Sequence, residues 1–155
     1  MTWLPHKTVA TVVERDGRFL MVKEAIAGEV VYNQPAGHLE QNESLIEAAV
    51  RETLEETAWR VDVKYFLGLY QYTSPANGLC YIRSCFIADA ITKIADRPLD
   101  ADILEAVWLT ADEIRGLGSS LRSPAVTMAV NDYLDGIRYP LSLIKRVTLS
   151  TYSRT

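Results

Sequence analysis

The segment from Gly37 to Trp59 combines a turn glycine with a predicted helix that carries five glutamates and one arginine. The acids are Glu43, Glu47, Glu52, Glu55 and Glu56, and the arginine is Arg51. Like charges three or four residues apart on a helix repel one another, so this density of carboxylates is destabilising by itself. It becomes favourable when a divalent cation and an anionic substrate bind there. The segment therefore predicts a metal site.

The helix is expected to begin near Glu43, because Asn42 is a favourable N-cap and acids in the first turn suit the helix dipole. Ser44 and Glu47 offer an alternative capping box. On a wheel of about 100° per residue, the residues predicted to face the core share one arc. They are Ile46, Ala49, Val50, Thr53 and Leu54.

Three glutamates lie at or beside the edge of this apolar arc. Glu56 falls just inside it, Glu52 just beyond it and Glu55 next to them. Two carboxylates at the margin of a core repel and lose hydration unless a positive group lies between them. A hard dication with oxygen ligands meets this need.

Arg51 lies one turn from both Glu47 and Glu55, so it can pair with either and hold a glutamate in position. The alternative interpretation is a solvated helix of surface salt bridges, which stabilise little. That alternative leaves the acids at the apolar border and the preceding Pro35-Ala36-Gly37 unexplained.

The same segment resembles the Nudix box, the signature of hydrolases that cleave a diphosphate linked to another moiety. The matching positions are Gly37, Glu43 and the run from Arg51 to Trp59. Thr53 stands where an aliphatic residue is usual, and Ala58 where the box has glycine. The chain therefore leaves the helix either without a left-handed residue at Ala58 or with some strain there.

The resemblance implies roles for particular residues. Gly37 would bring its carbonyl oxygen toward the metal, and Glu52, Glu55 and Glu56 would bind Mg²⁺, with Mn²⁺ as a candidate substitute. Arg51 would join Glu52 and Glu55 in the catalytic set by orienting a glutamate.

Four further segments resemble the NudJ branch of the same family. They are Pro5-His6, the run from Asn33 to Glu40, Leu121 to Pro124 and Arg138 to Leu141. Members of that branch act as phosphatases on nucleoside tri- and diphosphates and on the diphosphates of thiamine and its hydroxymethylpyrimidine precursor. The resemblance implies this substrate class.

Composition sets the limits of this interpretation. A chain of 155 residues with 48% hydrophobic content is expected to form a single domain over residues 1–155. The net charge of −4, without a run of basic residues, argues against binding a nucleic acid polymer but permits a small phosphorylated ligand. The start of the chain has no signal-peptide pattern and no stretch is long enough to span a membrane, so we expect a cytoplasmic protein. The sequence leaves open whether it is a monomer or a homodimer. Cys80 and Cys85 are expected to be reduced, packed thiols.

The order of apolar runs predicts an α/β fold with a mixed sheet between helices, and the Nudix resemblance implies the same α/β/α sandwich. Predicted strands cover residues 8–13, 19–23, 30–33, 61–72, 79–91 and 106–109. Asp16-Gly17 should close the first hairpin. Thr110 to Glu113 forms a capping box that opens a short helix, and a second helix runs from Pro124 to Leu134 with Gly136 as its stop.

Several residues outside the box are candidates for the site. Glu105 is the foremost late acid for a catalytic base, with Asp100 and Asp102 as alternatives along the same loop. Arg83 interrupts an apolar strand, so it needs either a phosphate or a structural acid as its partner. Arg122 stands just before a helix start, where it can meet a phosphate or lie at the surface.

The remaining substrate candidates are His38 and Tyr72. His38 and His6 are the only histidines, and either could contact phosphate or relay a proton, with a structural role as the alternative. Tyr72 is one of several tyrosines near strand ends that could stack a base or pyrimidine, although most such tyrosines are core residues.

The sequence therefore predicts a metal-dependent hydrolase of phosphoanhydride bonds. The alternatives are a Nudix pyrophosphohydrolase for a dinucleotide or nucleotide sugar, a nucleotide-sensing Nudix module without catalysis, and an isomerase built on the same fold.

Overall fold

The computed structural model describes residues 2–149. The strands are β1 (His6–Arg15), β2 (Arg18–Ile26), β3 (Glu29–Asn33), β4 (Ala36–His38), β5 (Trp59–Thr73), β6 (Cys80–Lys93) and β7 (Ile103–Thr110). The helices are α1 (Leu45–Thr57), α2 (Ala111–Gly116) and α3 (Ala125–Leu134), with short 3₁₀ turns η1 (Gly118–Ser120) and η2 (Leu141–Leu143). Within the described residues, no helix has the length and apolar character needed to cross a membrane.

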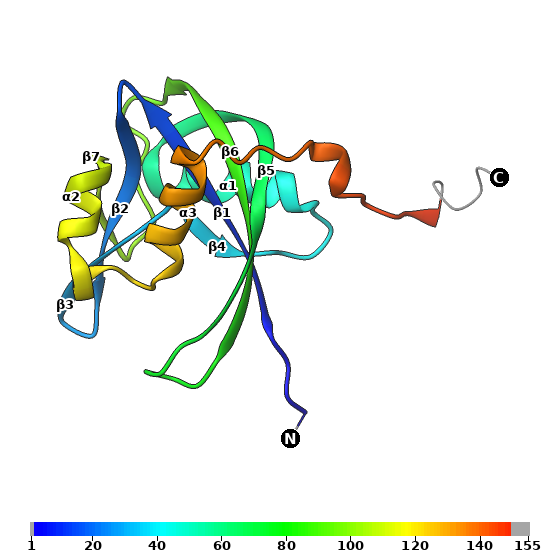
Figure 1. The fold of residues 1–155 in the computed structure, drawn as a ribbon, viewed down its shortest axis with the longest axis horizontal. Helices are drawn as coiled ribbons and strands as arrows, with labels where there is room; N and C mark the ends of the chain where they lie inside the picture. Colours follow the sequence, from blue (N-terminus) through cyan, green and yellow to red (C-terminus); the bar gives the residue numbers. More distant parts are fainter. Residues whose placement is uncertain (1, 150–155) are drawn as a thin grey trace.

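Strand β1 joins two parts of one mixed sheet. Residues 6–13 of β1 pair in parallel with β6, and residues 8–10 pair antiparallel with β4. Only its last two residues, Glu14 and Arg15, pair with β2, which is flanked in turn by β3 and β7. Figure 1 shows β5 and β6 as a long hairpin that extends beyond the rest of the sheet.

Helices cover the sheet through two separate core clusters, which follow the alternation of side chains along a strand. On β1, Val9 and Val13 belong to the cluster that packs against α1, through Ala48 and Ala49. Ala10 and Val12 belong to the other cluster, whose helical members are Ile114 of α2 and four residues of α3. Those four are Ala125, Val126, Ala129 and Val130. The predicted α/β/α arrangement with a mixed sheet is confirmed.

The predicted local signals at two connections are confirmed. Asp16 and Gly17 both have positive φ, 53° and 79°, as a two-residue hairpin turn of type I′ requires. Thr110 and Glu113 form the reciprocal capping box that opens α2. The remaining predicted strands are also present, most of them longer than the apolar runs alone suggest.

The prediction of Asn42 as the N-cap of the glutamate helix is wrong, and the start predicted near Glu43 lies two residues too early. Helix α1 begins at Leu45, and Ser44 is its N-cap, with the Ser44–Glu47 capping box complete in both directions. Asn42 instead adopts a left-handed conformation with φ of 64°, which asparagine tolerates better than most residues. The alternative capping box is therefore the one that forms.

The buried face of α1 lies closer to the glutamates than the wheel predicted. Ala49 and Thr53 are buried as expected, but Ile46, Val50 and Leu54 are only partly buried. Glu56 is itself buried. The polar Thr53 is accommodated because its hydroxyl group hydrogen-bonds the hydroxyl of Thr11 on β1 at 2.9 Å and donates to the Ala49 carbonyl at 2.8 Å.

Strand β4 was not predicted, because three residues after a proline give no periodic signal. It pairs with β1 in the register Thr8 to His38, Val9 to Gly37 and Ala10 to Ala36. This pairing places the glycine of the box within the sheet, on a strand that contacts α1.

Ala58 ends α1 in the left-handed conformation, with φ of 63° and a bond from its N–H to the Leu54 carbonyl at 2.9 Å. The sequence left open whether the chain would leave the helix with or without a left-handed residue at Ala58. The structure has the left-handed residue, which is the strained alternative. A residue with a Cβ atom is disfavoured in this region, roughly 1–2 kcal/mol for a non-glycine residue.

We expect Ala58→Gly to stabilise the protein, because glycine removes that strain, although it also adds freedom to the unfolded chain. A net gain of about 1 kcal/mol corresponds to a rise in Tm of roughly 2–4 °C. Ala95→Gly is the control, at an exposed position without a positive φ. Thermal unfolding measures both, and a lower Tm for Ala58→Gly than for wild type would contradict the assignment of strain.

Candidate active site

Gly37 lies directly against the carboxylate of Glu52. A Cβ atom built on Gly37 would lie 2.1–2.3 Å from the Glu52 carboxyl atoms, a distance that no real side chain permits. Glycine is therefore needed here for close approach of β4 to α1, and not for a left-handed turn, since Gly37 is absent from the residues with positive φ. The close approach places the backbone of β4 beside the glutamates.

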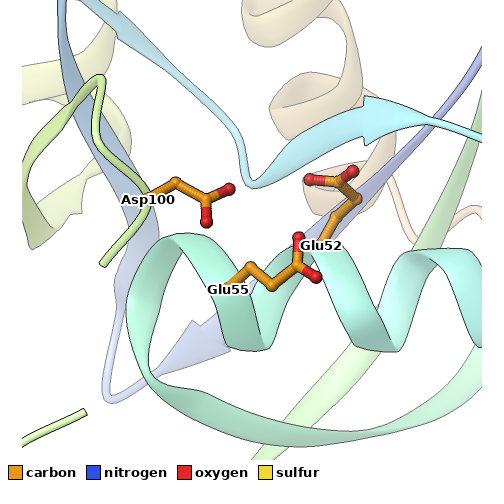
Figure 2. A group of neighbouring side chains, drawn as sticks. All are labelled: Glu52, Glu55 and Asp100. Atoms are coloured by element: carbon orange, nitrogen blue, oxygen red, sulfur yellow. The ribbon is translucent and has the colours of Figure 1, made fainter. Parts of the chain in front are cut away.

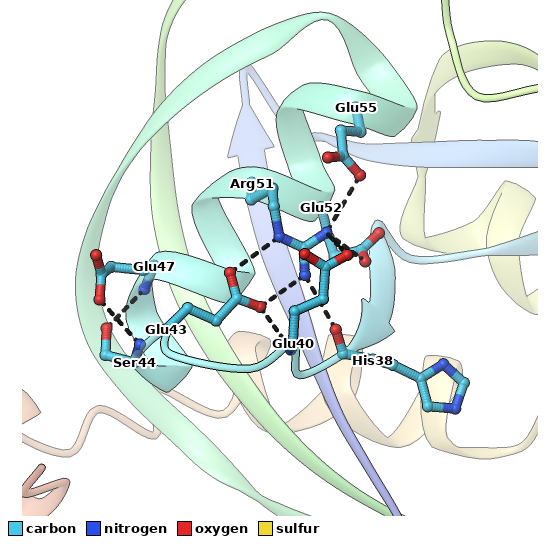
Figure 3. Close-up of polar contacts among 8 residues, drawn as sticks. All are labelled: His38, Glu40, Glu43, Ser44, Glu47, Arg51, Glu52 and Glu55. Carbon is cyan, nitrogen blue, oxygen red and sulfur yellow. Dashed lines mark hydrogen bonds and ion pairs between the residues drawn. The ribbon is translucent and has the colours of Figure 1, made fainter.

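Arg51 is the cation that organises the acids of α1 (Figure 3). It donates two hydrogen bonds to Glu43, at 2.7 and 3.0 Å, one to Glu52 at 2.8 Å and one to Glu55 at 3.2 Å. A further bond, at 3.0 Å, reaches the backbone carbonyl of His38 on β4. Arg51 thus fixes two catalytic candidates and the adjoining strand at once.

The expected pairing of Arg51 with Glu55 is present, but the alternative pairing with Glu47 is not. The Glu47 carboxylate accepts the Ser44 N–H of the capping box and lies 3.4 Å from Arg146. Hydrogen bonds from Arg51 are the main reason that the pKa of Glu43 is lowered. The two halves of the helix therefore use their acids differently, the first for capping and the second for the site.

Three carboxylates form a group suited to a cation (Figure 2). Glu52, Glu55 and Asp100 each offer one oxygen, and these three atoms lie within 4.8 Å of one another. Asp100 is on the loop before β7 and is held to the helix by a 3.1 Å bond from its N–H to the Glu55 carbonyl. An all-oxygen set of this kind fits a hard divalent cation. We call Glu52, Glu55 and Asp100 the acid group.

Burial acts against ionised carboxylates here in the absence of a cation. Desolvation is the main cause that raises the pKa of Glu52, and the hydrogen bond from Arg51 opposes it. Glu56 is deeper, accepts a 2.8 Å bond from the Ala36 N–H, and has a pKa raised to about 9, mainly by desolvation. Glu56 lies outside the acid group, although its pKa is also raised by the nearby charges of Glu52 and Asp100.

Glu105 is not brought into the acid group. It is exposed on β7, opposite Lys23 of β2, and its carboxylate lies 3.7 Å from the lysine Nζ. Of the three late acids considered from the sequence, Asp100 is the one that reaches the glutamates. Asp102 is exposed, and its backbone carbonyl accepts the Ala25 N–H.

A cavity of about 710 Å³ opens beside Glu52 and Glu56. Three parts of the chain form most of its wall. They are the β5–β6 hairpin together with β1, the β2–β3 hairpin, and the segment from η1 to the start of α3. All four residues predicted to bind substrate line it: His38, Tyr72, Arg83 and Arg122. The structure therefore brings these four side chains to one space.

The two arginines of the cavity differ in their surroundings. Arg83 is only partly exposed and donates a 3.0 Å bond to the side-chain oxygen of Gln34, and desolvation lowers its pKa. No carboxylate within residues 2–149 lies within salt-bridge distance of it. Arg122 instead pairs with the buried Glu24 at 2.9 Å. Of the two, Arg83 is thus the one without a carboxylate partner in the part of the chain that the structure describes.

Sequence reasoning missed Glu24 as a member of the cavity wall and Gln34 as the partner of Arg83. Glu24 lies two residues beyond the apolar run of β2, in step with the buried positions Leu20 and Val22, and this alternation is a signal that could have been used. Gln34 lies within the NudJ-like segment, but its contact with Arg83 is 49 residues away in sequence. His38 contacts the other histidine, His6, at 3.1 Å between ring nitrogens.

The fold, the box residues and the cavity define a Nudix hydrolase. Residues 4–127 match the NUDIX domain family, so the chain belongs to that family and acts on phosphoanhydride bonds. Phosphatase NudJ of Escherichia coli K12 is 41% identical over 140 residues, which cover 90% of each chain. The resemblance to the family and to its NudJ branch is confirmed.

Solved structures agree with this assignment. A NUDIX hydrolase from Nitrosomonas europaea superposes with a TM-score of 0.90 and 40% identity, over 93% of this chain and 98% of that one. An Ap4A hydrolase from C. elegans, at 16% identity and a TM-score of 0.68 over 84% and 96% of the two chains, shares the fold.

We expect Glu56→Gln to stabilise the metal-free protein above about pH 5. Between the ordinary carboxyl pKa of 4.5 and about 9, the folded protein retains a proton on Glu56 that the unfolded chain releases. The free energy of unfolding of the metal-free protein therefore falls as the pH rises through this window. Glutamine removes this dependence and can still accept the Ala36 N–H.

Thermal unfolding in a chelator between pH 5 and 9 measures the effect, with Glu29→Gln, at an exposed position, as the control. Each kcal/mol gained raises Tm by roughly 2–4 °C. Identical pH profiles for wild type and Glu56→Gln would refute the raised pKa.

Proposed function

We propose that the protein is a Mg²⁺-dependent phosphatase of nucleoside di- and triphosphates and of thiamine-type diphosphates. The observation that carries the proposal is the position of the acid group beside a cavity whose wall contains Arg83, an arginine without a carboxylate partner among the described residues. Similarity to phosphatase NudJ over 90% of the chain supports a phosphate-releasing activity. The substrate range follows the resemblance to the NudJ branch.

The residues divide into roles by their place in the structure. Glu52 and Glu55, held by Arg51, and Asp100 would hold the cation, with Glu56 and the Gly37 carbonyl as further ligand candidates. The bound cation would neutralise phosphate oxygens and lower the pKa of an attacking water. Arg83 and Arg122 would orient the phosphate chain through charge-assisted hydrogen bonds. His38 and Tyr72 would contact the remainder of the substrate.

The proton of the attacking water needs a carboxylate as acceptor. Glu105 was the first candidate from the sequence, but Lys23 holds it at the surface of β7. Asp100 is the late acid that belongs to the acid group, so we assign it this proton or a place among the ligands. Either role requires an ionised carboxylate.

A screen for inorganic phosphate release with Mg²⁺ tests the proposal directly. Nucleoside di- and triphosphates and thiamine diphosphate should release phosphate, and chelation should abolish the release. A single dinucleotide or nucleotide sugar preferred by a thousandfold would establish the pyrophosphohydrolase instead. A sensing module would bind nucleotides without turnover, and an isomerase would release no phosphate.

We expect Asp100→Asn to lower kcat by about 10²-fold or more, because the amide cannot accept a proton or neutralise a cation. Glu105→Gln is the matched control and should retain most of the wild-type kcat. Steady-state kinetics with one nucleoside triphosphate separates the two variants. A large loss for Glu105→Gln with little change for Asp100→Asn would return the role to Glu105.

Arg83→Ala should raise KM for all nucleotide substrates together. Loss of a charge-assisted hydrogen bond worth about 1.5–3 kcal/mol corresponds to a factor of roughly 10–150. Arg122→Ala should have a smaller effect, because Glu24 already partners that arginine. Arg115→Ala, on the surface of α2, is the control.

KM values for three nucleoside triphosphates, together with Tm for each variant, separate substrate binding from folding. Wild-type KM values for Arg83→Ala would contradict the phosphate contact.

A further inference from the structure

The side-chain amide of Gln34 is buried, and both of its ends have a partner. Gln34 is 2% exposed. Its Oε1 accepts a 3.0 Å hydrogen bond from Nη1 of Arg83, and its Nε2 donates to the Thr11 carbonyl at 3.3 Å and to Cys85 Sγ at 3.4 Å. Turning the amide around would oppose donor to donor and acceptor to acceptor, so these contacts fix which end faces the arginine. Gln34 therefore presents a fixed acceptor to Arg83.

The guanidinium of Arg83 depends on this acceptor. Among residues 2–149, Gln34 is the one hydrogen-bond partner of the Arg83 side chain. A guanidinium carries five N–H donors in a planar fork, so most of them remain for a group that enters the cavity that Arg83 lines. Holding a long side chain in one orientation costs conformational entropy. The bond to Gln34 supplies the orientation before a ligand binds.

The partner of Arg83 is an amide, and this choice affects the charge of the cavity. A buried arginine usually pairs with an acid, as Arg122 does with Glu24 in the same cavity. A carboxylate beside Arg83 would neutralise the guanidinium, whereas the amide oxygen holds it and leaves its charge in place. Desolvation is the main cause that lowers the pKa of Arg83, and the charge of Arg122 also lowers it. An anion bound in the cavity would oppose both effects.

The segment that carries Gln34 also holds the charged side chains of α1. Two residues further on, the Ala36 N–H donates to the Glu56 carboxylate at 2.8 Å. The His38 carbonyl accepts a 3.0 Å bond from Arg51 (Figure 3). Gln34 therefore ties the arginine of β6 to the same stretch of backbone that holds the metal end of the site. This connection sets the spacing between the candidate phosphate contact and the candidate metal ligands.

We propose that Gln34 is a positioning residue that holds Arg83 toward the phosphate of the substrate without cancelling its charge, a step that rests on the proposed function. Gln34 does not line the cavity, so it acts through Arg83. Removing its acceptor should weaken phosphate binding only while Arg83 is present. Replacing it with a carboxylate of the same shape should weaken phosphate binding even though the arginine stays in place.

A double-mutant cycle tests the first consequence. KM, kcat and Tm are measured with one nucleoside triphosphate for wild type, Gln34→Met, Arg83→Ala and the double variant. Methionine has a similar length but offers no amide oxygen. We expect Gln34→Met to raise KM about 3–10-fold, the range that the loss of one hydrogen bond corresponds to, and to leave kcat within about 2-fold. In the Arg83→Ala background the same change should raise KM by less than about 2-fold.

Ser84→Ala is the matched control for the loss of a buried hydrogen bond beside Arg83. Ser84 is the next residue on β6, points to the opposite face of the sheet and accepts a 2.6 Å bond from Lys7 Nζ. It should keep the wild-type KM, including when its Tm falls. An equal rise in KM for Gln34→Met in both backgrounds, or a wild-type KM for Gln34→Met whatever its Tm, would overturn the proposal.

Gln34→Glu tests the second consequence, and it does so independently of whether Gln34→Met folds. The new carboxylate can still accept the Arg83 N–H, but its charge pairs the guanidinium. We expect KM to rise by about 10-fold or more at neutral pH, because a cation that is already paired attracts phosphate less. A wild-type KM for Gln34→Glu would mean that the free charge of Arg83 does not bind the substrate, and it would overturn the proposal.

Binding of AMP separates this inference from the proposed function. AMP has no phosphoanhydride bond, so its dissociation constant, measured by calorimetry with Mg²⁺, does not depend on turnover. If no nucleotide releases phosphate, the proposed function is wrong, and an effect of Gln34→Met on AMP binding that disappears in Arg83→Ala would still support the positioning role. Additive effects of the two changes would overturn it. Adenosine lacks the phosphate, and a loss of adenosine binding equal to that of AMP in Gln34→Met would overturn it as well.

Discussion

The guanidinium of Arg51 is the interaction on which the site depends. Among residues 2–149 it is the one cation that bonds Glu43, Glu52 and Glu55 together, and it also holds the His38 carbonyl of β4. Without it, three carboxylates would approach one another at the edge of the core with only solvent to separate them. Its planar fork of donors allows several directed bonds at once, which the single ammonium of a lysine could not provide.

The backbone around Arg51 is arranged to permit this crowding. Because Gly37 has no side chain, the Glu52 carboxylate can lie against β4. Asp100 reaches the helix through a backbone hydrogen bond to Glu55, and so a loop joins a site otherwise built on regular elements. The cavity begins beside these glutamates. It lies between the two parts of the sheet that β1 joins, one with β5 and β6 and the other with β2 and β3.

The sequence predicted the elements whose signals are local. The box spacing, the Asp16-Gly17 turn and the Thr110 capping box depend on neighbours within a few residues. The site beyond the box depends on long-range contacts, such as Gln34 with Arg83, which no local pattern encodes. The choice of Asp100 over Glu105 belongs to the same class, because it is set by how the loop before β7 folds back onto α1. At the helix start, two caps of similar quality competed, and pattern alone could not rank Asn42 against Ser44.

The capping box of α1 has a consequence for how such an enzyme can change. Ser44 and Glu47 secure the start of the helix through bonds that involve none of the acid group. The acids that gather at its other end can therefore be altered without removing what starts the helix. A related protein that has lost the acid group, and with it hydrolysis, would keep the fold. The fold is then available for a new ligand before any new activity has appeared. Separation of the folding signal from the reactive edge makes this helix a tolerant place for functional divergence.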